Sequence, residues 1–354
     1  MTDLTHIQAR RICIIKPSAF GDVVQTLPIL PVLRERFPRA RISWVVRSEL
    51  RGLLDGHPCL DEVVPWCRRG GIGIWWRFLR DLRRREFDVA FDLQGLLRTA
   101  AMSLATRAPL RVGLETAREG AHWACHVTLR DTGPQVPAHL RYWRVAEALG
   151  LGERRRETIV DTSPEDRSWA NGQVAQLAAP VLAVCPGARW ATKRWPPEKF
   201  AAIAARAMRR YGFATVILGG KDEAETAGRL EYELRRFGLS ARVRNLASRT
   251  SIKQLAALLQ RSDVLLTNDS GPMHLAAGLG TRVAGVFTCT SPARSGPPGD
   301  RHQLITTALP CAGCYKKRCP RRGARHLACL SDVSIDGVWR GFQRLVERAR
   351  KRAA

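Results

Sequence analysis

Short apolar runs typical of buried strands alternate with helical stretches along most of this 354-residue chain. Expected strands of the first half cover residues 11–16, 41–46, 62–66 and 87–92. Those of the second half cover residues 181–185, 213–218, 242–245, 264–267 and 283–287. Such alternation indicates an α/β protein whose parallel sheets carry helices on both faces.

The charged, irregular stretch at residues 150–164 separates the two series. A single α/β core seldom fills a chain this long, so we expect two doubly wound domains, at residues 1–160 and 161–333. Residues 334–354 are expected to form a basic amphipathic helix with Val338, Phe342 and Leu345 on its apolar face. Ligands of doubly wound domains bind at the carboxyl ends of the strands, so the loops there are the candidates for chemistry.

The loop after the expected strand at 264–267 reads N-D-S-G-P-M-H over residues 268–274. Turn-forming residues followed by a proline near the first helical position predict a strand, a tight turn and a helix start. Free N–H groups and the positive end of the helix dipole make such a start suitable for an anion. Ser270 and His274 lie four residues apart and face the same way, next to Asp269. An ordinary capped corner is the alternative interpretation.

Two further loops carry candidate side chains. In K-P-S-A-F-G-D, residues 16–22, Asp22 is either a carboxylate favoured by the helix dipole or a general base. In C-P-G-A-R-W-A-T-K-R-W, residues 185–195, Thr192, Lys193 and Arg194 lie between a strand and a proline-led helix, an arrangement that suits phosphate. Neither loop matches a Walker A motif or a dinucleotide-binding G-x-G-x-x-G, so a hydride-transfer site is not supported.

The charge balance indicates a polyanionic partner, since 58 Lys and Arg against 32 Asp and Glu give a net charge of +26. The charge alone does not say whether that partner is nucleic acid, an anionic lipid surface or a phosphorylated glycolipid. Motifs for specific nucleic-acid binding are missing from the sequence, so nucleic acid is permitted but not favoured. No apolar run approaches the ~18 residues of a membrane span, and the first apolar run is too short for a signal peptide. We therefore expect a cytoplasmic chain with mostly reduced cysteines.

Four motifs occur in order along the chain: R-I-C-I-I-K-P-S-A-F-G-D-V-V-Q-T-L-P, F-D-V-A-F-D-L-Q-G-L-L-R-T-A, P-G-A-R-W-A-T-K-R-W-P and L-L-T-N-D-S-G-P-M-H-L-A-A. Together they resemble glycosyltransferase family 9, the lipopolysaccharide heptosyltransferases. The resemblance implies a GT-B fold, in which two Rossmann-like doubly wound domains face a central cleft. The N-terminal domain would bind the acceptor and the C-terminal domain the nucleotide-sugar.

The resemblance also implies an activity: inverting transfer of heptose from ADP-L-glycero-D-manno-heptose to the Kdo/lipid A inner core of lipopolysaccharide. No cofactor or catalytic metal is implied, in agreement with the absence of a D-x-D motif from the sequence. The implied partners are an ADP-activated sugar donor, an anionic glycolipid acceptor and the inner leaflet of the membrane, with no specific nucleic acid. The chain would therefore act in the cytoplasm, peripherally on the inner face of the inner membrane.

Site residues follow from the same resemblance. Asp22 matches the catalytic base, and donor-phosphate contacts are implied for Thr192, Lys193, Asp269, Ser270, Gly271 and His274. Nucleoside contacts are implied for Asp222 and Glu223. Acceptor contacts are implied for Arg68, Arg69 and Arg118, for which solvated surface arginines are the alternative.

A separate cluster near the C-terminus reads C-x2-C-x4-C-x6-H-x2-C, with Cys311, Cys314, Cys319, His326 and Cys329. Soft ligands at such short spacing are candidates for a structural zinc ion. Reduced thiols that simply pack are the alternative, because the spacing matches no standard zinc knuckle.

Two other functions stay open at this level. One is a GT-B transferase with a different nucleotide-sugar or acceptor, because the motifs indicate phosphate binding better than they indicate the identity of the sugar. The other is a polyanion-binding protein with a degenerate catalytic site. The intact Asp22, Lys193 and D-S-G-x-x-H residues argue against degeneracy.

Overall fold

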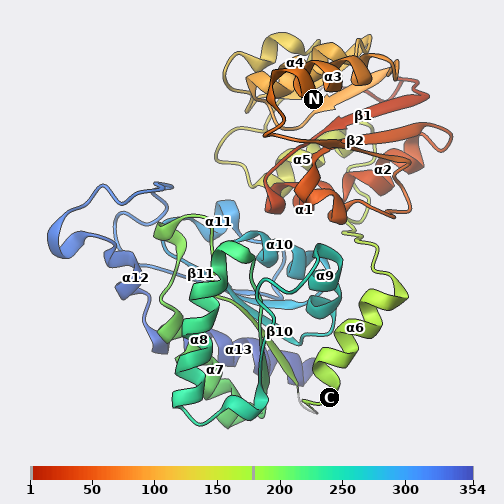
Figure 1. Cartoon of the computed structure of the whole chain (residues 1–354). Helices are drawn as coiled ribbons and strands as arrows, with labels where there is room; N and C mark the ends of the chain where they lie inside the picture. The colour runs from red at the N-terminus through yellow and green to blue at the C-terminus, as the bar shows by residue number, and fades with distance from the viewer. Residues whose placement is uncertain (1–2, 178–179, 354) are drawn as a thin grey trace. The chain divides into compact units, whose positions relative to one another are not determined.

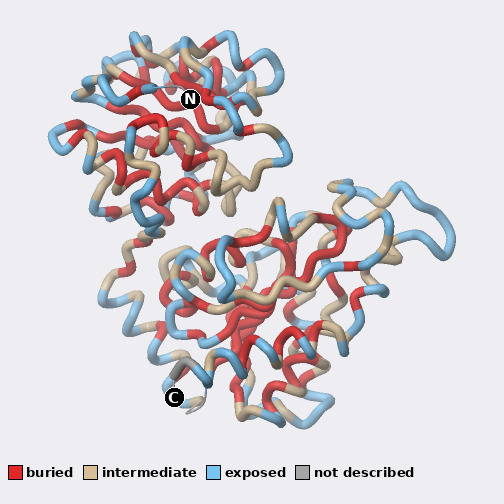
Figure 2. The backbone as a smooth tube through the Cα atoms, turned by 180° about the vertical axis from the view of Figure 1, so that it is seen from behind, coloured by how far each residue is buried: buried red, intermediate tan, exposed pale blue. Residues whose placement is uncertain are grey.

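The computed structural model of the chain describes residues 3–177 and 180–353. Its internal contacts divide into two compact units, Met1–Asp161 and Thr162–Ala354, and each is described by itself (Figure 1). Within the described residues, each unit is built around one six-stranded sheet in which all paired strands are parallel. Figure 2 shows the most buried backbone concentrated in these sheets.

The N-terminal unit has the strand order β3-β2-β1-β4-β5-β6. Its strands are β1 (Arg11–Ile15), β2 (Arg41–Arg47), β3 (Glu62–Trp66), β4 (Val89–Asp92), β5 (Leu110–Leu114) and β6 (Val127–Leu129). Its helices are α1 (Phe20–Thr26), α2 (Ile29–Arg36), α3 (Gly71–Arg83), α4 (Leu97–Ala105) and α5 (Ala138–Ala148), with the short 3₁₀ turns η1 (Ser48–Leu53) and η2 (Ala121–Ala124). Helices α3 and α4 pack together on one face of the sheet, and α1, α2 and α5 pack on the other (Figure 1).

The central strand β1 is buried on both faces because helices cover both sides of the sheet. Cys13 and Ile15 point into the cluster formed with Phe78 of α3 and Met102 of α4, and Ile14 pairs in register with Trp44 of β2. A strand in this position needs apolar residues at every position rather than at alternate ones, which explains the continuous apolar run in its sequence.

The C-terminal unit has the strand order β12-β11-β10-β7-β8-β9. Its strands are β7 (Val181–Cys185), β8 (Ala214–Ile217), β9 (Val243–Asn245), β10 (Val264–Asn268), β11 (Arg282–Phe287) and β12 (Gln303–Thr306). Its α-helices are α6 (Pro164–Ala175), α7 (Pro197–Tyr211), α8 (Ala224–Arg236), α9 (Ile252–Gln260), α10 (Gly271–Gly278), α11 (Pro292–Ser295), α12 (Ala328–Asp332) and α13 (Ile335–Ala353). Its 3₁₀ turns are η3 (Ala191–Lys193), η4 (Lys221–Glu223), η5 (Ser240–Arg242) and η6 (Gly323–Arg325).

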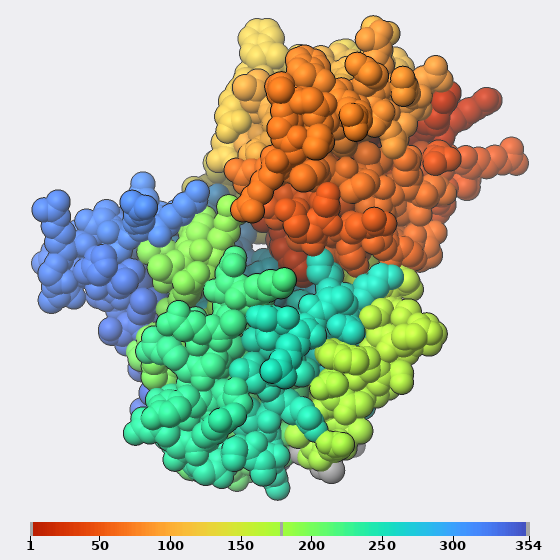
Figure 3. All heavy atoms as spheres, in the orientation of Figure 1, coloured from red at the N-terminus to blue at the C-terminus, as the bar shows by residue number. Residues whose placement is uncertain are grey.

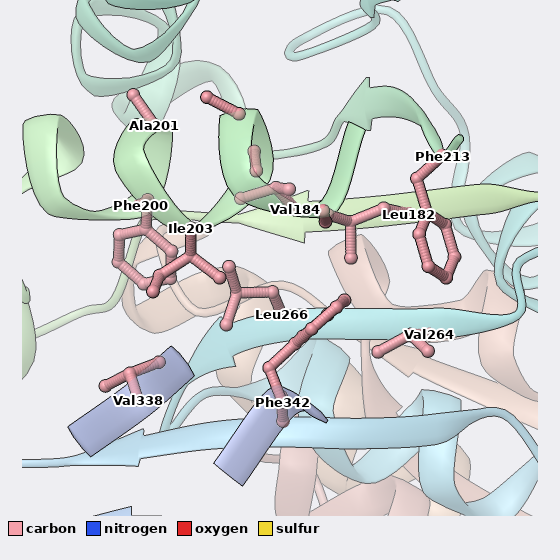
Figure 4. Close-up of a cluster of buried hydrophobic side chains, with 14 of the residues drawn as sticks. Leu182, Val184, Phe200, Ala201, Ile203, Phe213, Val264, Leu266, Val338 and Phe342 are labelled. Atoms are coloured by element: carbon pink, nitrogen blue, oxygen red, sulfur yellow. The ribbon is translucent and has the colours of Figure 1, made fainter. Parts of the chain in front are cut away.

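The last helix, α13, is part of the core of this second unit. Val338 and Phe342 pack with Leu182 of β7 and with Phe200 of α7 in one buried cluster (Figure 4). Each large apolar side chain buried in this way stabilises the fold by about 1.5–3 kcal/mol. The apolar stripe expected for residues 334–354 therefore packs against the sheet of the C-terminal unit.

Three strands had no counterpart among the expected ones. They are β5, β6 and β12, with the sequences L-R-V-G-L, V-T-L and Q-L-I-T. Two of them are edge strands and all three are short and partly exposed, so they lack the long apolar run that marks a central strand. No helix among residues 3–177 and 180–353 is long and apolar enough to cross a membrane.

Candidate active site

The loops that carry the candidate donor residues leave three neighbouring strands of the C-terminal sheet. Strand β7 lies between β10 and β8, and both pairings are parallel. The carboxyl ends of the three strands therefore meet at one edge, the usual ligand edge of a doubly wound sheet. Residues 186–196, 219–223 and 269–271 follow these ends directly.

Lys193 and Asp269 form an ion pair at this edge, with 2.7 Å between Nζ and Oδ2. Their side chains are only 18% and 6% exposed. The two loops are joined by Asn268, whose Oδ1 accepts from the Trp195 N–H at 3.1 Å and whose Nδ2 donates to the Pro186 carbonyl at 2.7 Å. The ammonium group is thus held in a fixed position, as expected of a group that balances a bound anion.

Thr192 is tied to the backbone around it. Its hydroxyl donates to the Lys316 carbonyl at 2.8 Å, and its own carbonyl accepts from the Thr288 hydroxyl at 2.7 Å. The neighbouring Lys193 ammonium lies 4.8 Å from the ring centroid of Trp190, within cation–π range. In this structure the Thr192 hydroxyl therefore fixes the lysine loop.

Asp269 and Ser270 separate strand β10 from helix α10. Ser270 is its N-cap residue with an extended backbone, and its hydroxyl lies 3.1 Å from that of Thr267. Gly271 is the first helical residue, so Pro272 is the second rather than the first. The N–H groups of a first helical turn have no partner within the helix and favour an anion. His274 is buried in the same turn.

The two acidic residues after β8, Asp222 and Glu223, lie in different surroundings. The Glu223 Oε2 accepts from the Gly220 N–H at 2.9 Å, and a Cβ placed on Gly187 would lie 2.1 Å from the Glu223 carboxyl group. Glu223 therefore packs against the loop that carries Lys193, and glycine is needed at Gly187 to admit it. Asp222 is exposed. Of the two, only Glu223 lies against the lysine loop.

Asp22 lies at the carboxyl end of β1 in the N-terminal unit, as the third residue of α1. Its Oδ2 accepts from the Ala19 N–H at 3.1 Å, which is the capping role considered for it. Its Oδ1 accepts from the Tyr142 hydroxyl at 3.0 Å. The carboxylate is therefore held on both oxygens and is only partly buried.

Lys16 lies beside Asp22 and was not among the sequence candidates. Its ammonium donates to the Leu93 carbonyl at 2.9 Å and lies 4.5 Å from the ring centroid of Tyr142. Burial lowers the pKa of Lys16, and the nearby carboxylates of Asp22 and Asp92 oppose that shift. A buried cation thus adjoins the Asp22–Tyr142 pair.

Asp92 and Tyr142 complete this group and were likewise not among the candidates. Asp92 ends β4, where burial raises its pKa and its Oδ1 accepts from the N–H groups of Gln94 and Gly95 at 3.0 Å each. Burial, followed by the charge of Asp22, raises the pKa of Tyr142 well above its usual value. Asp92 could have been noticed in F-D-L-Q-G, but no local signal marks Tyr142, which lies 120 residues from Asp22.

The three candidate acceptor arginines follow two strands of the N-terminal sheet, β3 and β5. Arg118 is exposed after β5, and its charge contributes to the lowered pKa of Lys16, so it lies within electrostatic reach of that group. Arg68 and Arg69 are exposed in the turn between β3 and α3. No described contact brings them to Asp22.

The C-terminal thiols are the sequence candidates for a structural zinc site. In residues 3–177 and 180–353 there is no group of three or more His, Cys, Asp and Glu side chains arranged to hold a metal ion. Burial raises the pKa of the Cys329 thiol to about 11, and the neighbouring Cys289, Cys311, Cys314 and Cys319 add to the rise. Cys319 Sγ accepts from the Leu327 N–H at 3.4 Å.

Known proteins resemble this chain in both sequence and fold. It is 27% identical over 331 residues to lipopolysaccharide heptosyltransferase 1 of Pseudomonas aeruginosa, covering 87% of each chain. It is also 27% identical over 307 residues to the lipopolysaccharide core heptosyltransferase OpsX of Haemophilus influenzae, covering 84% of each. A family 9 glycosyltransferase from Veillonella parvula has a similar fold, with a TM-score of 0.80 at 21% identity and coverage of 98% of each chain.

The fold of E. coli ADP-heptose lipopolysaccharide heptosyltransferase II is also similar, with a TM-score of 0.77 at 23% identity over 96% of this chain and 99% of that one. These likenesses confirm the GT-B fold class expected from the sequence. The model of glycosyltransferase family 9 (heptosyltransferase) matches residues 75–324, which confirms the family and the enzyme class. The chain belongs to glycosyltransferase family 9, the heptosyltransferase family.

Proposed function

We propose that this chain transfers heptose from ADP-activated heptose to the inner core of lipopolysaccharide. The observation that carries the proposal is the Lys193–Asp269 pair beside the first turn of α10, in a family whose members include lipopolysaccharide heptosyltransferases. One E. coli relative of similar fold has been solved with ADP-2-deoxy-2-fluoro heptose.

The donor diphosphate would bind at the strand ends of the C-terminal unit. The Lys193 ammonium and the N–H groups of the first α10 turn would meet its oxygens, with Ser270 and His274 at the same turn. Charge grows on the departing diphosphate while the sugar takes on oxocarbenium character. Preorganised positive groups stabilise that growing charge most in the transition state, so they accelerate transfer rather than only tighten binding. Glu223, which packs against Gly187, is our candidate for a contact to the nucleoside.

The acceptor hydroxyl would be deprotonated by Asp22. A positioned general base contributes about 10²–10⁴-fold to such a reaction. The hydrogen bonds from Tyr142 and the Ala19 N–H orient the carboxylate and favour its charged form. No step in this scheme uses a metal ion, because Lys193 and α10 supply the positive charge that the diphosphate needs.

The acceptor we propose is an anionic Kdo/lipid A glycolipid. Arg118 lies within electrostatic reach of Lys16 beside Asp22, and Arg68 and Arg69 follow an outer strand of the same sheet. A lipid-anchored acceptor requires the enzyme to work at a membrane surface, which we propose is the cytoplasmic face of the inner membrane. The net charge of +26 is consistent with that location.

Calorimetric titration with ADP, UDP and GDP in the presence of EDTA tests the donor. We expect selective binding of ADP, and loss of that binding in Lys193→Ala. Preference for UDP or GDP would retain the transferase but change the sugar donor. Absence of binding to all three would favour a polyanion-binding protein and remove the support for the donor site.

A further inference from the structure

Exposed apolar side chains gather on one part of the N-terminal unit. Six of the eight exposed large hydrophobic residues found in the described chain lie on α3, α4 and η2: Ile72, Ile74, Trp76, Leu97, Leu104 and Trp123. Helix α4 packs against both α3 and η2, so the three elements form one continuous surface, which we term the α3–α4 surface. Figure 3 shows the α3 part of this region, in orange, at the surface of the N-terminal unit.

Helix α3 is apolar on two faces. Phe78 and Leu82 are buried against the sheet. On another face, Ile72 and Trp76 lie one turn apart and are 72% and 61% exposed. Arg80 continues this face one turn further on. The outer face contributes nothing to the core, although exposing it to water is unfavourable.

A pocket of about 600 Å³ lies at the end of this outer face. It is lined by Arg80, Arg83, Arg84, Glu86, Phe87, Thr106 and Arg107. The one carboxylate among these residues, Glu86, is already paired with Arg11 at 3.1 Å. The pocket therefore presents guanidinium groups from the C-terminal ends of α3 and α4. A guanidinium group can donate two parallel hydrogen bonds to the oxygens of one phosphate.

We propose that the α3–α4 surface docks on an anionic lipid bilayer, with Ile72 and Trp76 in the interfacial layer and the arginine pocket on a lipid phosphate. The proposal rests on the proposed function, whose acceptor is anchored in lipid. Tryptophan favours the boundary between head groups and acyl chains, and a mixed apolar and basic helix face binds to anionic lipid by both contributions.

The charge of the surface favours lipid over a second copy of this chain. Residues 68–84 contain six arginines, at 68, 69, 77, 80, 83 and 84, and a single acid, Asp81. Two such surfaces facing one another would bring like charges together, which is unfavourable. An anionic bilayer complements both the charge and the apolar residues.

Vesicle co-sedimentation of the full chain tests the proposal. The vesicles are phosphatidylcholine with phosphatidylglycerol, and phosphatidylcholine alone as the uncharged comparison. We expect binding to the anionic vesicles that weakens with added salt. Arg80→Gln/Arg83→Gln should weaken it about 25-fold, at about fivefold for each arginine near an anionic surface.

The apolar contribution is tested by Ile72→Ser/Trp76→Ser, with Tyr232→Ser as the matched control. Tyr232 is also a large exposed side chain, 61% exposed, but lies on α8 of the C-terminal unit. We expect the double variant to bind anionic vesicles at least tenfold more weakly, and the control to bind like the unmodified protein. Calorimetric ADP binding should be unchanged in all variants, which separates loss of docking from failure of the donor site.

Equal vesicle binding by the surface variants and the Tyr232→Ser control would overturn the proposal, as would failure of the unmodified protein to bind anionic vesicles. Self-association in sedimentation velocity that the Ile72→Ser/Trp76→Ser change abolishes would also overturn it and assign the surface to a second copy of the chain. None of these outcomes depends on ADP binding, so each is distinguishable from failure of the proposed function.

Discussion

The Tyr142 hydroxyl donates a 3.0 Å hydrogen bond to the Asp22 carboxylate, joining α5 to the start of α1. Tyr142 is almost fully buried, and the Lys16 ammonium lies over its ring. A tyrosine in this position fixes one carboxylate oxygen and favours the charged form of the acid. The candidate base is thus oriented by a residue that lies far away in sequence.

Tyr142→Phe should therefore change catalysis as well as packing. A hydrogen bond to a charged group contributes about 1.5–3 kcal/mol, and its loss frees the Asp22 Oδ1 from its fixed position. We expect kcat/KM to fall because the candidate base is no longer oriented. ADP binding should not change. If kcat/KM is unchanged while only thermal stability falls, Tyr142 has a structural role alone.

Removing both charges of the Lys193–Asp269 pair should restore stability but not donor binding. Lys193→Met leaves the Asp269 carboxylate buried without its cation, which is strongly destabilising. Lys193→Met/Asp269→Asn removes both charges and should recover most of that stability in a denaturant titration. ADP affinity should stay at least tenfold reduced in both variants, because the group that balances phosphate is missing in each. Recovery of ADP affinity in the double variant would show that Lys193 acts only on the fold.

Gly187→Ala tests the close approach of Glu223 to the lysine loop. The added Cβ would lie 2.1 Å from the Glu223 carboxyl group, so one of the two must move. We expect weaker ADP binding by calorimetry, with partial recovery in Gly187→Ala/Glu223→Ala. Gly228→Ala is the matched control, because Gly228 lies in helix α8 with nothing within 4 Å of the added atom. Unchanged ADP affinity in Gly187→Ala would remove this loop from donor binding.

His57 predicts how stability depends on pH. Burial lowers its pKa to about 4, and its Nδ1 accepts from the Cys59 N–H at 3.1 Å. The unfolded chain takes up this proton near pH 6.5, so between about pH 6.5 and 4 it binds more protons than the folded chain. His57 therefore stabilises the folded chain above pH 6.5, and this contribution is lost as the pH falls toward 4. The free energy of unfolding lost in this way is on the order of 3 kcal/mol.

Chemical denaturation at a series of pH values measures this loss. His57→Asn keeps an acceptor near the Cys59 N–H and should flatten the dependence between pH 6.5 and 4. His6→Asn is the control, since the His6 side chain is 75% exposed. An equally steep dependence in His57→Asn and in the control would assign the acid sensitivity to other groups.

The loops of the candidate site could be proposed from the sequence because their signals are local. Asp269 directly follows a buried strand, and Asp22 and Lys193 lie in the segments after two others, where turn residues and helix starts are visible in a few adjacent positions. The partners of these residues depend instead on how distant helices pack. Tyr142 reaches Asp22 only because α5 packs on α1, and nothing in the sequence around Tyr142 specifies that helix register.

The same distinction explains the errors. The edge strands β6 and β12 carry too few apolar residues to be recognised alone, although pairing with β5 and β11 orders them. Thr192 was correctly placed in the lysine loop, yet its hydroxyl is bound to the Lys316 carbonyl, a residue that only the folded chain brings close.

The proposed activity is measured directly as transfer from ADP-L-glycero-D-manno-heptose to Kdo/lipid A by the unmodified protein and by Asp22→Asn. Mass spectrometry of the glycolipid reports the product. We expect the unmodified protein to add one heptose, and Asp22→Asn to be slower by about 10²–10⁴-fold while its ADP affinity stays within a few-fold. Absence of a heptosylated product from the unmodified protein, under conditions in which it binds ADP, would contradict the account.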